Sequence, residues 1–344
     1  MENKISFFEK NLSVWVLICM VLGVFISLVL PQIPSSLNAL QIAGINLPTS
    51  ILLWFMIFPM LLKIDFQSIK NIRNNPNGLY STWISNWFFQ PITMFLIAGM
   101  FFYYIYAGIL PADVSAEFFT GAIILGTAPC TAMVFVWSKL TNGNPAYTVV
   151  QTATNDLIIL ILFVPWVSLL LGVSDIEVPY STLIASTVIF VLIPLVLSVL
   201  VRHFVIKSKG EEYLYGTVIA KFDKFTMIGL LLTLVLIFSY QGMAILSNPI
   251  YIALISIPLI IQAFLMYFIS TKLTQLFKLP KDISAPAILI STSNFFELAV
   301  VVAIATYGID SLVVLVCTVG VLVEVPLMLF LVKLINKKNG ENNE

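Results

Sequence analysis

The stretch GTAPCTAMVFVWS, Gly126 to Ser138, places a proline and a cysteine between threonines in the middle of a long apolar segment. Proline removes a backbone hydrogen-bond donor and clashes with the preceding helical turn, so a helix that contains this stretch is predicted to break here. The backbone groups that a break releases need polar partners, which Thr127 and Thr131 can supply. In a membrane, such a break is tolerated only where it is buried in protein or lines a cavity.

The composition around this stretch is that of a membrane protein. Of the 344 residues, 60% are hydrophobic and only 10% are charged, and the mean hydropathy is +1.02. A soluble domain of this size could not carry so much apolar surface. The formal net charge of zero gives no reason to expect nucleic acid as a partner, and the single histidine excludes a histidine-rich metal site. The three cysteines have no CxxC spacing, so neither a disulfide framework nor a zinc site is expected.

Segment counting predicts an all-α polytopic protein with ten transmembrane helices, since about 20 apolar residues cross ~30 Å of hydrocarbon. The expected ranges are 12–30, 45–62, 80–108, 118–138, 147–171, 180–201, 225–245, 250–271, 283–308 and 310–332. In this arrangement all 17 Lys and Arg residues fall on one side of the membrane, and the opposite connections carry only acidic residues. The positive-inside rule therefore predicts that both termini are cytoplasmic.

Three carboxylates, Asp156, Glu297 and Glu324, fall inside predicted spans rather than in connections. An ionisable side chain there costs about 2.5–3.5 kcal/mol on insertion scales, so each is a candidate functional residue. The alternative is a protonated, hydrogen-bonded residue that only helps helices to pack. This alternative is weaker for Glu297 than for Asp156 and Glu324.

The spacing of the unusual residues indicates an internal repeat. Asp156 follows Cys130 by 26 residues (156 − 130), and Glu324 follows Glu297 by 27 (324 − 297). Two halves of five spans, residues 1–175 and 176–344, would enter the membrane from opposite sides, as in the inverted repeats of secondary transporters.

The ninth predicted span carries a polar interruption, Ser291 to Asn294, at a depth that matches the break beside Cys130. Paired broken helices in two halves are the best sequence pointer to a substrate site at the midplane. Cys130 is then expected at the start of a cytoplasm-directed half-helix, although a cysteine in a membrane helix is usually a small buried hydrophobe. For Cys19 and Cys317 we expect only this packing role.

Four segments carry a resemblance to a known family. They are APCTAMVFVWS at 128–138, TATNDLIIL at 152–160, STSNFFELAV at 291–300 and GVLVEVPLML at 320–329. These segments resemble the signature segments of the arsenite efflux permeases, the arsenical-resistance branch of the bile acid/sodium symporter superfamily. The resemblance covers essentially the whole chain.

The resemblance implies a cell-membrane transporter that expels trivalent arsenic, arsenite and with it antimonite, from the cytoplasm in exchange for protons. It implies no cofactor, because the proton gradient supplies the energy. Cys130 and Glu297 match the essential cysteine and glutamate of the family. One branch of the family has arginine immediately before the cysteine, whereas this chain has Pro129, so no role of that arginine is carried over.

The chemistry of the residues agrees with this substrate. Arsenite near neutral pH is an uncharged trihydroxide that is strongly drawn to sulfur, and one thiol with several hydroxyl or amide groups suits it. Three converging thiols would hold arsenic too tightly for release. The candidate substrate-binding residues are Cys130, Thr127, Thr131, Asn294, Ser293 and Asn155. Glu297 is the expected proton carrier, with Asp156 and Glu324 as further proton-coupling candidates, because burial among apolar neighbours favours the neutral form of a carboxyl group.

Two other classes of protein remain as alternatives. A sodium-coupled symporter of a small organic anion would use the same broken helices, but sodium needs no thiol and an anion would benefit from a cation at the midplane. An intramembrane aspartyl protease needs two aspartates within the membrane, and only Asp156 qualifies. We therefore expect a transporter rather than an enzyme.

Overall fold

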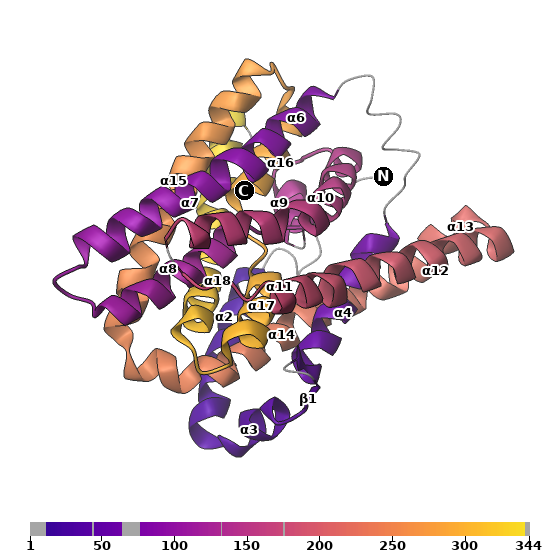
Figure 1. Cartoon of the computed structure of the whole chain (residues 1–344). Coiled ribbons are helices and arrows are strands. Elements are labelled where there is room, and N and C mark those ends of the chain that lie inside the picture. The colour runs from indigo at the N-terminus through magenta and orange to yellow at the C-terminus, as the bar shows by residue number, and fades with distance from the viewer. Residues whose placement is uncertain (1–11, 43–44, 64–75, 132, 175, 341–344) are drawn as a thin grey trace.

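The surface of the molecule identifies the environment in which the chain folds. The computed structural model describes residues 12–42, 45–63, 76–131, 133–174 and 176–340, and most of them are helical (Figure 1). Large apolar side chains face outward: Leu17 is 60% exposed, Ile161 70% and Ile250 67%. An apolar surface this extensive contacts hydrocarbon rather than water. The prediction of an all-α integral membrane protein is confirmed.

The described part of the first half of the chain is mostly helical. Its elements are α2 (Leu12–Val29), α3 (Gln32–Asn38), β1 (Gln41–Ile42), β2 (Ile45–Asn46), α4 (Leu47–Leu62), α6 (Asn77–Ile84), the π-helical turn η2 (Ser85–Phe89), α7 (Gln90–Gly99), the π-helical turn η3 (Met100–Ile105), α8 (Ala112–Gly126), α9 (Val134–Leu140) and α10 (Pro145–Gly172). The two strands pair antiparallel, with Gln41 opposite Asn46.

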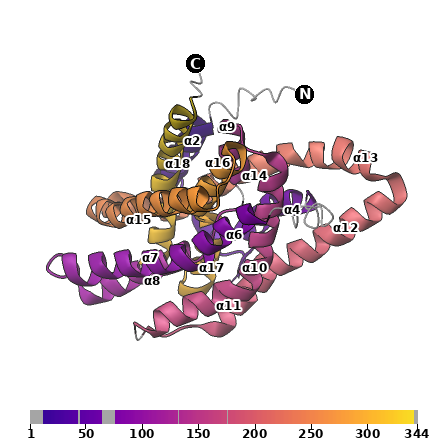
Figure 2. The same cartoon turned by 90° about the horizontal axis from the view of Figure 1, so that it is seen from above.

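The second half is built in the same way. Its elements are α11 (Tyr180–Thr187), η4 (Val188–Leu192), α12 (Ile193–Lys209), α13 (Glu211–Tyr213), η5 (Leu214–Ile219), α14 (Ala220–Ser247), α15 (Pro249–Leu276), α16 (Lys281–Thr292), α17 (Phe296–Tyr307) and α18 (Leu312–Asn339). Figure 2 shows α7, α8 and α15 extending to one side of the molecule and α12 and α13 to the other.

Fewer helices than ten satisfy the length and apolarity needed to cross a membrane. Six in the described part do so: Asn77–Ile105, Pro145–Gly172, Tyr180–Lys209, Ile228–Ser247, Pro249–Leu276 and Leu312–Asn339. A seventh is added if Val14–Val29 and Gln32–Asn38, bent by 99°, form one span. The predicted spans 118–138 and 283–308 are each divided into two short helices, which individually are too short for a crossing. The count of ten stays a prediction.

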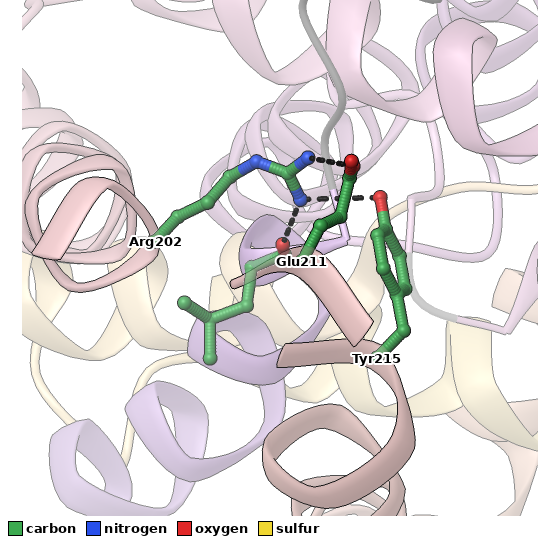
Figure 3. Close-up of polar contacts among 4 residues, drawn as sticks. Arg202, Glu211 and Tyr215 are labelled. Carbon is green, nitrogen blue, oxygen red and sulfur yellow. Dashed lines mark hydrogen bonds and ion pairs between the residues drawn. The ribbon is translucent and has the colours of Figure 1, made fainter. Parts of the chain in front are cut away.

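One group of helices is formed by α2, α4, α12 and α14, in which α14 packs along α2 and α4, and α12 packs on α4. The buried side chain of Arg202, on α12, links this helix to the end of α4 and to α13 and η5 (Figure 3). It donates to the carbonyl oxygen of Leu62 at 3.1 Å and to the hydroxyl of Tyr215 at 3.2 Å, and it pairs with Glu211 at 3.6 Å. The ends of α4 and α12 are thereby held to α13 and η5.

The second group is centred on the contact between α8 and α18, around which α7, α15, α16 and α17 pack. Glycine permits the close approach of the two central helices. A Cβ atom on Gly121 would lie 2.6 Å from Cβ of Val316, and one on Gly320 would lie 2.6 Å from Cδ2 of Leu125. α8 leads into the first break at its C-terminal end, so its tight packing on α18 positions that break.

Both ends of α18 are tied to the interrupted fourth segment. At one end the backbone N–H of Leu312 donates to Oε2 of Glu117 on α8 at 2.8 Å. At the other end Nδ2 of Asn336 donates to the carbonyl oxygen of Leu140, the last residue of α9, at 2.9 Å. Glu117 satisfies one of the free N–H groups at the helix N-terminus and complements its dipole.

Candidate functional site

The helix breaks that the sequence predicts are present in both segments. α8 ends at Gly126 and α9 begins at Val134, while α16 ends at Thr292 and α17 begins at Phe296. Close packing fixes the first break, because a Cβ on Gly126 would lie 2.5 Å from Cγ of Met94.

The two interruptions cross in contact with each other. The backbone N–H of Cys130 donates to the carbonyl oxygen of Ser293 at 3.1 Å, and that of Phe295 donates to the carbonyl oxygen of Ala128 at 2.7 Å. Pro129 and Asn294 form an isolated antiparallel bridge between them. Each break therefore satisfies backbone groups of the other, as a buried non-helical segment requires.

Cys130 lies within the break itself, not at the start of a half-helix as expected. It lies four positions before Val134, the first residue of α9, and its backbone N–H donates to the carbonyl oxygen of Ser293. The side chain is 0% exposed. The short-range dipole of α9 therefore acts less on the thiol than the sequence suggested.

Ser293 links the crossing to α18. Its hydroxyl donates a short hydrogen bond to Oε1 of Glu324, which is 6% exposed. Within the described chain Oε2 of Glu324 has no hydrogen-bond partner. Hydrogen bonds thus connect the main chain of Cys130 to Ser293, and the side chain of Ser293 to Glu324.

Glu297 lies in the first turn of α17, three residues beyond Asn294 at the crossing. Its side chain is 0% exposed, and neither carboxyl oxygen has a hydrogen-bond partner among the residues that the structure describes. A buried carboxyl group without partners is more stable when it is neutral. The position at a helix N-terminus supplies a partial positive field that stabilises the charged form. These opposing effects suit a group that gains and loses a proton.

Asn294 and Asn155 are held by side chains from other helices. Nε2 of Gln90, at the start of α7, donates to Oδ1 of Asn294. Oδ1 of Asn155 on α10 accepts from Nε1 of Trp87 at 3.4 Å and from Nε2 of Gln151 at 3.3 Å. Asn294 lies at the crossing, and Asn155 lies on α10, bonded to Trp87 and Gln151. Their role in substrate binding stays a prediction.

The remaining candidate residues differ in whether their side chains already have hydrogen-bond partners. The hydroxyl of Thr127 donates to the carbonyl oxygens of Ile123 at 2.8 Å and Ile124 at 3.2 Å, so its hydrogen caps α8 and is not directed into the site. Asp156, next to Asn155 on α10, is buried. The hydroxyl of Thr131 is also buried, and it has no hydrogen-bond partner among the described residues.

The other two cysteines are remote from the crossing. Cys19 is buried in α2, and Cys317 lies in α18 with its sulfur 3.6 Å from the carbonyl oxygen of Gly121. All three cysteines are free, and no group of three or more His, Cys, Asp or Glu residues in the described ranges could hold a metal ion. The polar chemistry at the crossing consists of one thiol with hydroxyl, amide and carboxyl groups.

Sequence reasoning missed Asn86, Gln90 and Gln151, which are at most 1% exposed. Gln90 contacts Asn294 directly, and Gln151 contacts Asn155. A signal was present, since Asn86 and Gln90 are four residues apart and can share one side of a helix, as can Gln151 and Asn155 on α10.

Comparison with known proteins identifies the family of the chain. The Sodium Bile acid symporter family matches residues 50–248. The Arsenical-resistance protein Acr3 of Alkaliphilus metalliredigens is 48% identical over 333 residues, which cover 97% of this chain and 93% of the relative. The Arsenical-resistance protein Acr3 of Corynebacterium glutamicum is 32% identical over 96% of this chain and 89% of its own. An uncharacterized transporter of Synechocystis is 35% identical over 97% of this chain and 89% of its own.

Proposed function

Because the chain belongs to the Sodium Bile acid symporter family, we propose that it is a secondary active transporter that exports trivalent arsenic from the cytoplasm in exchange for protons. Family membership makes the protein a transporter and not an enzyme. The choice of arsenic follows the two relatives named as arsenical-resistance proteins, which span almost the whole chain.

The observation that carries the proposal is the position of Cys130. It is the one cysteine in a helix break, and it lies against Ser293 at the contact of the two interrupted segments. A single thiol surrounded by hydroxyl and amide groups suits the neutral trihydroxide of arsenic, and antimonite has the same chemistry. One sulfur ligand permits release, which transport requires.

The transport cycle needs a conformational change, because the Cys130 side chain is 0% exposed. Two groups of helices can move as rigid bodies in such a change: α2, α4, α12 and α14 form one, and the helices around α8 and α18 form the other. Each group is packed more closely within itself than against the other. In alternating access, one bundle rocks against the other around a fixed site. The crossing and its hydrogen bonds would stay intact within the second group.

We assign the coupling proton to Glu297, with Asp156 and Glu324 as further candidates. Glu297 is supported by its unpartnered oxygens beside the crossing. Glu324 is less suited, because one oxygen already accepts from Ser293. A proton that enters on Glu297 and leaves inside moves one positive charge per neutral molecule expelled, so the exporter is electrogenic.

The transporter is proposed to lie in the cell membrane with both termini in the cytoplasm. Residues 1–175 and 176–344 form two inverted repeats of five spans, in which the fourth and ninth spans are the interrupted ones. The matching breaks, one between α8 and α9 and one between α16 and α17, support this arrangement.

Arsenite uptake into everted vesicles tests the proposal. A pH gradient that is acidic inside the vesicle should accelerate uptake without sodium, and antimonite should compete. The alternative, a sodium-coupled symporter of a small organic anion, predicts uptake that depends on sodium and does not respond to the pH gradient.

A further inference from the structure

Four buried amides, Asn86, Gln90, Gln151 and Asn155, lie on two neighbouring helical segments beside the crossing. We refer to them as the amide cluster. Each is at most 1% exposed. Gln151 donates to Asn155 at 3.3 Å, and Trp87, the neighbour of Asn86, donates to the same oxygen at 3.4 Å.

The position of Asn86 follows from its neighbours along one face of the α6–η2–α7 helix. One turn earlier, the hydroxyl of Thr82 is 2.7 Å from that of Tyr147 on α10. One turn later, Gln90 donates to Asn294. Asn86 therefore lies on the face that is turned toward α10 and the crossing, between these two contacts.

The amide cluster has more polar atoms than the described chain satisfies. Both amide atoms of Asn86, Oε1 of Gln90, Oε1 of Gln151 and Nδ2 of Asn155 have no hydrogen-bond partner among the described residues. Buried polar atoms are nearly always bonded to protein, water or a ligand. The unpartnered atoms comprise both donors and acceptors, which an uncharged molecule with hydroxyl groups can satisfy, as water does. A cation would use only acceptors and an anion only donors.

We propose that the amide cluster is a second binding position for the uncharged trihydroxide, occupied before the molecule reaches Cys130. This inference rests on the proposed function. The cluster adjoins the crossing through Gln90 and Asn294, and it extends toward the ends at which α6 and α10 begin, which are the expected cytoplasmic ends. It binds through hydrogen bonds without sulfur, so the molecule can pass on to the thiol.

The test is the Asn86→Leu variant, which has nearly the size of asparagine without polar atoms. We expect the KM for arsenite in everted vesicles to rise about 10-fold, as the loss of one or two hydrogen bonds implies, with the maximal rate within about twofold. The Tm of the purified variant should be unchanged or higher, because unpaired buried polar atoms are removed. If Asn86 only stabilised the fold, the variant would show a lowered Tm and an unchanged KM.

The control is Gln262→Met, which changes a buried amide on α15 that is bonded to Thr93 and lies outside the amide cluster. Its KM should equal that of the unsubstituted protein. If Asn86→Leu does not accumulate in the membrane, Asn86→Thr replaces it, and its KM should still rise. A KM equal to that of the unsubstituted protein, with a lowered Tm, overturns the second position. The proposed function fails separately, if the unsubstituted protein shows no arsenite uptake driven by the pH gradient.

Discussion

The backbone N–H of Cys130 and the carbonyl oxygen of Ser293 are 3.1 Å apart, which joins the two interrupted segments at the residue that carries the thiol. The bond is made by the main chain, so substitution of either side chain leaves it in place. The side chains at the crossing can therefore be changed singly to separate chemistry from folding.

Cys130→Ala should abolish arsenite resistance in a host that lacks its own exporter, because the affinity of sulfur for arsenic is lost. Cys19→Ala and Cys317→Ala are the matched controls and should retain most of the resistance. Cys130→Ser keeps a hydrogen-bonding group, so any residual transport in it measures the contribution of hydrogen bonds alone. Full resistance in Cys130→Ala at equal membrane abundance would show that this cysteine only packs.

Glu297→Gln keeps the size and much of the hydrogen bonding of a protonated glutamic acid but cannot release a proton. It should bind arsenite and lose accumulation driven by the proton gradient. In the unsubstituted protein, membrane potential should contribute ~2.3 kcal/mol per 100 mV to export. Uphill transport in Glu297→Gln vesicles with a normal response to pH would move the proton site to Asp156 or Glu324.

The hydrogen bond from Ser293 to Glu324 predicts a graded response at position 324. Glu324→Gln retains an acceptor oxygen for Ser293 and should keep most of its stability and transport. Glu324→Leu leaves the buried hydroxyl without its partner and should cost about 1–3 kcal/mol, measured as a fall in Tm in detergent. Equal Tm values for the two variants would mean that this bond does not hold Ser293.

Gly121→Ala tests the packing of α8 on α18. The added Cβ would lie 2.6 Å from Val316 Cβ, and overpacking of this kind costs about 1–3 kcal/mol. Gly216→Ala is the control, because a Cβ there meets nothing within 4 Å and alanine favours a helix. The Tm should fall in the first variant and stay level or rise in the second.

The orientation of the chain can be measured with cysteines introduced into a cysteine-free background. An impermeant maleimide should label positions 113 and 310, which are Asp113 and Asp310, from outside the cell. Positions 209 and 281, which are Lys209 and Lys281, should be labelled only after lysis. The reverse pattern would invert the orientation, and a mixed one would contradict the inverted repeat.

The sequence by itself determined the membrane class and the places where two helices break. Both rest on local signals: apolar side chains partition into hydrocarbon wherever they stand, and at each break several helix-weakening residues follow one another, Pro129 among them. A single proline is not enough, since Pro165 and Pro326 lie inside continuous helices. The resemblance to arsenite efflux permeases was readable for the same reason, since it lies in short contiguous segments.

Only the tertiary structure decided which polar groups meet. Ser293 donates to Glu324 of α18, and Gln90 donates to Asn294, which is distant from it in sequence. The hydroxyl of Thr127 instead donates to a carbonyl oxygen of its own helix. Hydropathy places a residue at a depth but leaves open the rotation of its helix and the identity of its neighbour. Those are fixed by the packing of side chains between helices, as where Gly121 and Gly320 let α8 and α18 approach.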